Sequence, residues 1–242
     1  MINLLIFCTM LSKPAQSEIE SRKVTLGPQT CQKLLILDMD ETLLHSRFHK
    51  ICGPADMFET GIQADENGVL EFNLLLASRP NCPPTTRLNV KLRQHLEEAL
   101  QFLGQMYELC VFTAGEQDYA DAILNYIDPD RSLIKHRLYR QHCVRPQHGV
   151  YVKDLSIISD RDLRDIIIVD NSIISFAFHM SNGIPIKAFL GNKNDEELLF
   201  MVTFLEELFS HTDVRKHIDA TFKLQAFTQK YGRRGNQAND NS

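Results

Sequence analysis

Two carboxylates stand two residues apart at the end of an apolar run, in "KLLILDMDETLLHS", residues 33–46. Side chains at positions i and i+2 of an extended segment point the same way, so Asp38 and Asp40 are predicted neighbours. Neighbouring carboxylates repel each other, and one is forced neutral unless a cation intervenes. Mg²⁺ prefers oxygen ligands and keeps several waters, so one or two carboxylates are enough to hold it. The pair therefore predicts a magnesium site.

Four more polar residues lie in comparable places along the chain. Thr113 ends the run "YELCVFT", Asp170 and Asn171 follow "DIIIV", and Lys153 lies in "YVKDL". Ligands of open α/β sheets bind beyond the carboxyl ends of the strands, where such side chains converge. Asp170 and Asn171 offer further oxygen ligands to the cation, and a hydroxyl with an ammonium could hold phosphate oxygens.

This set of side chains predicts phosphoryl transfer. An aspartate can attack phosphorus and form an aspartyl-phosphate. A second carboxyl group can protonate the leaving oxygen and then activate water, while Mg²⁺ screens the nucleophile's charge from that of the phosphate. The alternative, that Asp38 and Asp40 only form a turn after a strand, leaves the other four polar residues unexplained.

The elements that must position these residues follow from hydrophobic patterning. Apolar runs without a polar face predict buried parallel strands at 34–38, 107–113 and 166–169, and "IPIKAF" suggests a fourth. Apolar residues at helical spacing predict helices at 91–106, 116–127 and 195–209. Strands alternating with helices predict an α/β domain, with a Rossmann-like, mostly parallel sheet flanked by helices.

The rest of the chain divides around this domain, which we place at 31–225. Residues 1–30 are a lead-in, 51–89 an irregular insertion with a strand at 70–76, and 226–242 a disordered tail. The apolar stretch 2–11 favours a short strand or a loosely packed lead-in; a weak membrane tether or a signal sequence is the alternative. It is far shorter than the ~20 residues that span a bilayer.

Composition bounds the partners. A net charge of −5 and a pI near 6.0 argue against a general nucleic-acid binder. Six scattered cysteines without a CxxC pair indicate reduced thiols in an intracellular protein, and argue against a zinc site or a disulfide framework. Neither the choice between nucleus and cytoplasm nor the oligomeric state follows from the sequence.

Four motifs carry a family resemblance. "LDMDETLLHS", "VFTAG", "YVKDL" and "IIVDNS" resemble the motifs of the haloacid dehalogenase superfamily. More narrowly, they resemble the small phosphatases that act on the C-terminal domain of RNA polymerase II and the Dullard-like (NLI-interacting factor-like) phosphatases. The similarity runs from about residue 32 to 222. It implies a haloacid dehalogenase-like fold with a small antiparallel sheet inserted at about 134–152. It also implies a Mg²⁺-dependent protein serine/threonine phosphatase with the DxDxT motif.

The resemblance also implies a role for individual residues. Asp38 matches the nucleophile and Asp40 the general acid/base. Mg²⁺ in the family is held by the first aspartate, the backbone carbonyl of the second and the asparagine of the last motif, here Asn171. Asp170 beside it supports the metal through water.

Five further residues match the substrate-binding positions of the family. Thr113 and Lys153 match the pair that holds the phosphate. Arg140 matches an arginine near that phosphate, and a surface salt bridge is its alternative role. Phe48 and Tyr119 match aromatic positions of a peptide groove, and simple packing is the alternative for both.

Some features depart from the family pattern and bear on the substrate. "KLRQ" stands where "KRP" is usual, and Ile173 follows "DNS" where proline is common. The segment 134–152 resembles a partial wall, and an open site suits a phosphorylated segment of another protein. Direct nucleic-acid binding is not expected, and membrane contact would be weak, through the N-terminus. A small-molecule phosphatase and a non-catalytic scaffold of the same fold remain alternatives.

Overall fold

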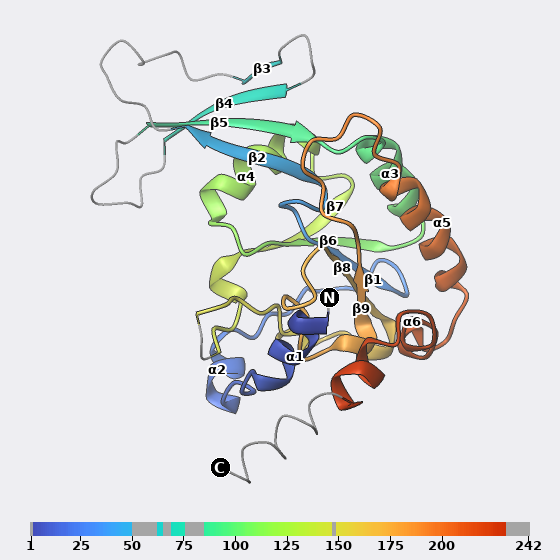
Figure 1. The fold of residues 1–242 in the computed structure, drawn as a ribbon. Helices are drawn as coiled ribbons and strands as arrows, with labels where there is room; N and C mark the ends of the chain where they lie inside the picture. Colours follow the sequence, from blue (N-terminus) through green and yellow to red (C-terminus); the bar gives the residue numbers. More distant parts are fainter. Residues whose placement is uncertain (1, 50–61, 65–68, 76–84, 147–148, 231–242) are drawn as a thin grey trace.

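A parallel sheet of five strands forms the centre of the computed structural model, which describes residues 2–49, 62–64, 69–75, 85–146 and 149–230 (Figure 1). The strand order is β7-β6-β1-β8-β9, and neighbouring strands all run parallel. The strands are β1 (Leu34–Leu37), β6 (Glu108–Phe112), β7 (Ile134–Leu138), β8 (Ile166–Asp170) and β9 (Gly183–Pro185). The predicted α/β class with a mostly parallel sheet is confirmed.

Each face of the sheet has its own core, because successive side chains of a strand point to opposite faces. Leu35 and Leu37 belong to a core built with α3 (Leu96–Leu103), α4 (Gln117–Ile127), α5 (Glu197–Phe209) and α6 (Val214–Phe222). Leu34 and Ile36 belong to a second core, built with α1 (Ile2–Met10), α2 (Gln16–Ser21) and residues from 138–180. All four residues of β1 are buried, as an apolar run without a polar face predicts.

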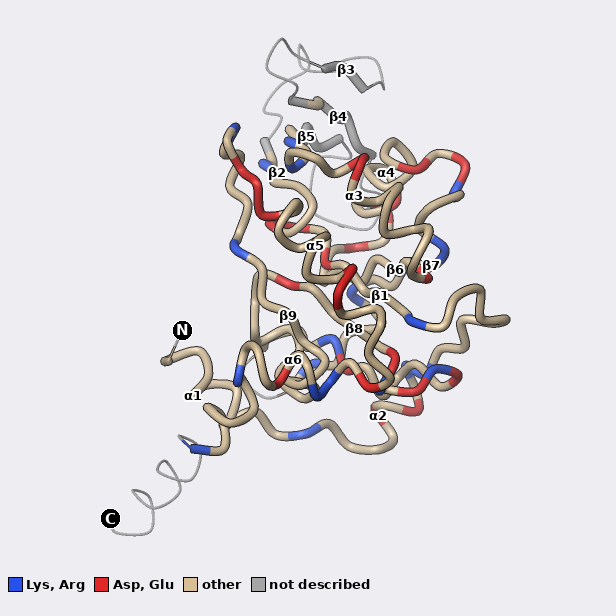
Figure 2. Tube along the Cα trace, turned by 90° about the vertical axis from the view of Figure 1, so that its right-hand side faces the viewer, with Lys and Arg blue, Asp and Glu red and all other residues tan. Residues whose placement is uncertain are grey.

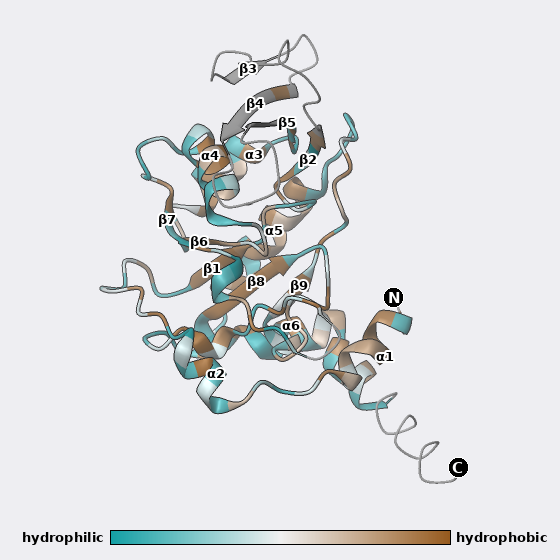
Figure 3. Ribbon diagram, turned by 90° about the vertical axis from the view of Figure 1, so that its left-hand side faces the viewer, coloured by the Kyte–Doolittle hydropathy of each residue, from teal (hydrophilic) through white to brown (hydrophobic). Residues whose placement is uncertain are grey.

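The apolar N-terminal segment is a helix, so the prediction of a strand or a loose lead-in was wrong. Helix α1 packs in the second core, with Leu5 and Cys8 buried and Leu4 and Met10 exposed. Figure 3 shows that most of its ribbon is hydrophobic. Its apolar residues therefore have a packing role within the fold. Within the described ranges, no helix is both long enough and apolar enough to cross a membrane.

A second, antiparallel sheet has the strand order β2-β5-β4-β3. Its strands are β2 (Leu44–His49), β3 (Ile62–Ala64), β4 (Val69–Leu75) and β5 (Thr85–Leu92). A small antiparallel sheet was predicted, but its position at 134–152 was wrong. That segment contributes β7 to the main sheet, and otherwise one isolated antiparallel bridge joins Val144 and Val152. The sheet lies instead around the segment predicted to be an irregular insertion, 51–89. Residues 51–61, 65–68 and 76–84 of that segment lie outside the described part.

The helix predicted at 91–106 begins only at Leu96. Lys91 and Leu92 belong to β5, where Leu92 pairs with Leu44 of β2 and Lys91 pairs with Val69 of β4. Four short 3₁₀ helices complete the described elements: η2 (Arg140–His142), η3 (Leu155–Ile157), η4 (Leu163–Asp165) and η5 (Met180–Asn182). The helices predicted at 116–127 and 195–209 correspond to α4 and α5.

The C-terminal tail was predicted to be disordered from residue 226, yet residues 224–230 are helical, and 231–242 lie outside the described residues. Basic and acidic residues are both scattered over the described chain (Figure 2). The cysteines within the described ranges, Cys8, Cys31, Cys110 and Cys143, are unpaired.

Candidate active site

A pocket of about 460 Å³ lies at the carboxyl ends of β1, β6 and β8. Because these strands are parallel neighbours, the residues that follow them meet at one edge of the sheet. The nine residues predicted for the site all line this pocket: Asp38, Asp40, Phe48, Thr113, Tyr119, Arg140, Lys153, Asp170 and Asn171. Their chemical roles stay predictions.

The buried ammonium of Lys153 lies between two carboxylates. Its Nζ donates to Asp38 Oδ1 and, at 2.7 Å, to Asp170 Oδ2. Burial alone would lower the pKa of Lys153, but the charges of Asp170 and Asp38 raise it above its ordinary value. Burial and the charge of Asp38 raise the pKa of Asp170 to about 6, against the effect of Lys153. Lys153 is therefore a fixed positive charge at the base of the pocket.

Two hydroxyl groups hold the side chain of Asp40. Thr113 Oγ1 donates to Asp40 Oδ2 at 3.3 Å, and the Tyr119 hydroxyl donates to Asp40 Oδ1. Burial raises the pKa of Asp40 to about 6; the Tyr119 hydrogen bond opposes this rise and the nearby charge of Asp38 adds to it. The Tyr119 hydroxyl also lies 2.7 Å from Ser46 Oγ on β2. Asp40 is thus a carboxyl group that can exchange a proton near neutral pH.

The loop between β1 and β2 is a tight turn that also bonds to the loop after β8. The backbone N–H groups of Leu43 and Leu44 donate to the carbonyl of Met39, at 2.9 and 3.2 Å. Glu41 has a φ of 57°, in the left-handed region. The strand β2 follows this loop. The Thr42 hydroxyl accepts the backbone N–H of residue 171 at 3.2 Å, which joins this loop to the one after β8.

Arg93 also fixes this loop through a hydrogen bond to its backbone, a role that the sequence did not predict. Its fully buried guanidinium donates to the carbonyl of Thr42 at 2.8 Å and to that of Lys187 at 2.8 Å. It also forms a forked pair with Asp195, at 2.7 and 3.0 Å. In the sequence, Arg93 stood out only as part of "KLRQ", which departs from the usual "KRP". The partners are 102 positions apart, so no local pattern signals the pair.

The remaining predicted residues form the rim of the pocket. Arg140 pairs with Glu116 at 2.8 Å and donates to the carbonyl of Ala114 at 2.7 Å, so the salt bridge named as its alternative is present. Phe48 is 57% exposed, and its ring centroid lies 5.4 Å from that of the buried Tyr119. Both aromatic rings therefore line the pocket, and Phe48 is available for contact with a ligand.

The side chains at the base of the pocket fit a hard divalent cation. Asp38, Asp170 and Asn171 present carboxylate and amide oxygens, the ligands that Mg²⁺ prefers. The carboxylates of Asp38, Asp40 and Asp170 share one pocket with the buried ammonium of Lys153, which donates to Asp38 and Asp170. Burial raises the pKa values of Asp40 and Asp170, and the charge of Asp38 adds to both rises. A cation bound among these oxygens would relieve the surplus of negative charge.

Comparison with known proteins gives consistent matches. The family model described as NLI interacting factor-like phosphatase matches residues 33–215. CTD small phosphatase-like protein 3 of Caenorhabditis elegans is 33% identical over 216 residues, which cover 88% of this chain and 68% of the relative. CTD nuclear envelope phosphatase 1B of Danio rerio is 35% identical over 184 residues, 76% of this chain and 70% of the relative.

Other matches cover less of the relative. CTD small phosphatase-like protein 2 of Dictyostelium discoideum is 40% identical over 190 residues, 78% of this chain but 30% of the relative's length. The solved structure of the fission yeast RNA polymerase II CTD phosphatase Fcp1 with beryllium fluoride has a TM-score of 0.51 at 23% identity. The match covers 81% of this chain and 57% of that one, and at this identity it supports the fold alone.

Proposed function

The chain belongs to the NLI interacting factor-like phosphatase family, and from this premise we propose that it is a Mg²⁺-dependent protein serine/threonine phosphatase. One observation carries the proposal. Asp38 and Asp40 share a pocket with Thr113 and Lys153, and each carboxylate makes a direct hydrogen bond with one of those two residues. This is the set that an aspartyl-phosphate mechanism needs: a nucleophile, a proton donor and groups that hold the phosphate.

Asp38 is the proposed nucleophile. Its carboxylate attacks phosphorus, and the bond between phosphorus and the substrate's serine or threonine oxygen breaks, which leaves an aspartyl-phosphate. Lys153 and Thr113 are positioned to donate to the non-bridging oxygens. The buried ammonium of Lys153 is already in place before the reaction, so little reorganisation is required.

Asp40 is the proposed acid and base. A carboxyl group with a pKa of about 6 is partly protonated near neutral pH, so it can give its proton to the departing hydroxyl oxygen. The same group, now ionised, takes a proton from the water that hydrolyses the aspartyl-phosphate. Thr113 and Tyr119 hold the side chain of Asp40 for both steps.

Asp38, the backbone carbonyl of Asp40, and Asn171 are the proposed Mg²⁺ ligands, with Asp170 acting through water. When bound, the ion supplies positive charge that screens the nucleophile from the phosphate.

The substrate we propose is a phosphorylated segment of another protein. The exposed ring of Phe48 at the rim of the pocket supports contact with a polypeptide beside the phosphate. The relatives named CTD small phosphatase-like and CTD nuclear envelope phosphatase support a phosphorylated protein as the class of substrate. They also support an intracellular location, in the nucleus or the cytoplasm.

Phosphate release tests this proposal. Wild type, Asp38→Asn and the control Asp118→Asn, an exposed acid on α4, are assayed with an aryl phosphate, with Mg²⁺ or with EDTA. We expect turnover by wild type and by the control, with loss in Asp38→Asn and in EDTA. Phosphate release by wild type that does not exceed that of Asp38→Asn would rule out the aspartate mechanism, and no release by either protein would favour a scaffold. Faster turnover of sugar phosphates than of phosphoserine peptides would favour a small-molecule phosphatase.

A further inference from the structure

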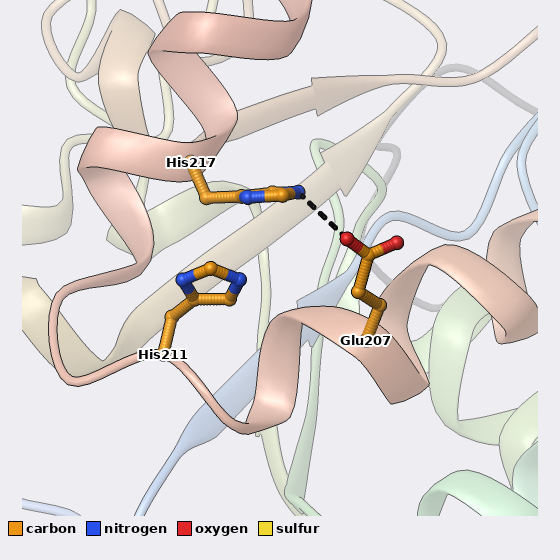
Figure 4. Close-up of side chains that lie close together, drawn as sticks. All are labelled: Glu207, His211 and His217. Atoms are coloured by element: carbon orange, nitrogen blue, oxygen red, sulfur yellow. Dashed lines mark ion pairs between the residues drawn. The ribbon is translucent and has the colours of Figure 1, made fainter.

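A group of metal-ligating side chains lies outside the active site, where α5 ends and α6 begins. Outside the active-site pocket, the described part of the chain has one group of three His, Cys, Asp or Glu side chains that could hold a metal ion: Glu207, His211 and His217 (Figure 4). One ligand atom from each lies within 4.8 Å of the others, and His217 Nε2 is 3.7 Å from Glu207 Oε1. None of the three lines the active-site pocket.

We propose that Glu207, His211 and His217 bind a transition-metal ion of the zinc class. Two imidazoles and one carboxylate form a ligand set that zinc uses, with water or a further ligand in a fourth position. Tetrahedral bonds of ~2.0–2.1 Å place ligand atoms roughly 3.3 Å apart. The present separations need only small side-chain rotations to reach that geometry. Glu207 has the freedom to move, since its side chain is 66% exposed.

The backbone around the three ligands is anchored. Leu208, Val214 and Ile218 are fully buried in the core between the helices and the sheet, and they flank the cluster along the chain. The connection between the helices is held at Asp213, whose side chain accepts the N–H of Arg215 and caps α6. The ligands thus project from a fixed frame, which lowers the entropic cost of gathering them round an ion.

Ring packing orients the two imidazoles. The ring centroid of His217 lies 4.3 Å from that of His211 and 5.6 Å from that of Phe204. The two rings are close enough that one nitrogen of each can reach the same cation. The C-terminal end of α5 contributes too, since its last carbonyls carry partial negative charge that favours a cation. A bound ion would clamp the end of α5 to α6.

Zinc titration of the metal-free full chain tests this site. Mg²⁺ is kept in large excess to occupy the active site, and a chromophoric chelator competes for Zn²⁺. The variants are His217→Asn, His211→Asn and Glu207→Gln, with His95→Asn as a control. His95 is exposed and has a φ of 63°, a conformation that asparagine tolerates.

We expect wild type and His95→Asn to bind one tight equivalent of Zn²⁺ that each ligand variant loses or binds at least roughly tenfold more weakly. Zn²⁺ should also raise the melting temperature of wild type but not that of His217→Asn. Equal affinity and stoichiometry in all variants would overturn the proposal. So would a thiolate-to-metal charge-transfer band with Co²⁺ in place of Zn²⁺, since it would assign the ion to cysteines. Because Glu207 is largely exposed, Glu207→Gln keeps the test decisive if a histidine variant fails to fold.

Discussion

Replacing Arg93 by methionine should destabilise the protein far more than breaking an exposed ion pair. Arg93 is buried, and its guanidinium makes four hydrogen bonds, two to Asp195 and one each to the carbonyls of Thr42 and Lys187. Methionine fills similar volume but leaves the Asp195 carboxylate, itself 7% exposed, without its cation. Removing one partner of a buried pair costs about 3–5 kcal/mol. For a domain of this size, that lowers the melting temperature by roughly 6–20 °C.

The matched control is Arg164→Met. Arg164 also pairs with an aspartate, Asp162 at 3.0 Å, but both side chains are more than half exposed. An exposed pair contributes only about 0–1 kcal/mol. Urea unfolding followed by circular dichroism gives the free energy of unfolding for each variant. The comparison isolates burial, because both variants lose an arginine–aspartate pair.

A second measurement links Arg93 to catalysis. Its bond to the Thr42 carbonyl fixes the loop that carries Asp40, so Arg93→Met should also lower kcat under conditions in which the variant is fully folded. A loss of stability no greater than that of Arg164→Met would refute the reasoning about buried charge. Unchanged kcat in the folded variant would show that the loop is held by other contacts.

Three more predictions follow. Tyr119→Phe removes the hydroxyl that donates to Asp40, and since a hydrogen bond to a charged group contributes about 1.5–3 kcal/mol, kcat should fall roughly 10- to 100-fold. Burial alone would raise the pKa of the Asp154 carboxyl. The hydrogen bonds from His179 and Ser156 outweigh this effect and hold the pKa below its ordinary value. The ionised Asp154 therefore stabilises the fold above its unfolded pKa of ~3.9, and this stability is lost as pH falls through its lower folded pKa. We expect the urea midpoints of wild type and Asp154→Asn to differ at neutral pH and to converge only in that acid range. Leu5→Ala should cost about 2–5 kcal/mol in urea unfolding, because Leu5 is 1% exposed in the second core.

Each of these predictions has a control in the same element or of the same kind. Tyr126→Phe, in α4 but 43% exposed, should leave kcat unchanged; an equal loss there would remove the argument for Tyr119. The difference in urea midpoint between Asp118→Asn and wild type should not change with pH. A constant difference in urea midpoint between Asp154→Asn and wild type across pH 3–7 would contradict the stated pKa shift. Leu4→Ala, at a position 45% exposed, should cost little, and if Leu5→Ala costs no more, α1 does not stabilise the fold.

The sequence predicted the parts of the fold that rest on local patterns. The runs predicted as strands at 34–38, 107–113 and 166–169 correspond to the buried strands β1, β6 and β8, because a strand covered on both faces needs no polar positions. Polar residues at their carboxyl ends therefore meet in one pocket.

The misplaced elements depend on contacts between distant residues. Leu92 lies four positions before Leu96 and so extends the helical pattern, but pairing with Leu44 keeps it in a strand. The apolar segment that forms α1 has no polar face from which to read a period, and only its place over the second core explains its helix. The pair of Arg93 with Asp195 joins two segments that carry no mutual signal in the sequence. Long-range pairing thus decided what local patterning could not.

Successive side chains of β1 point alternately into the two cores, and this has an evolutionary consequence. Leu34 and Ile36 serve one core and Leu35 and Leu37 the other, and the nucleophile candidate Asp38 follows at once. Exchanges among aliphatic residues leave this arrangement intact, so the strand can drift in sequence. Inserting or deleting a single residue would instead exchange the two sets of side chains and turn the aspartate to the opposite face. Lineages of this fold should therefore accumulate substitutions in this strand while keeping its length to the first aspartate constant.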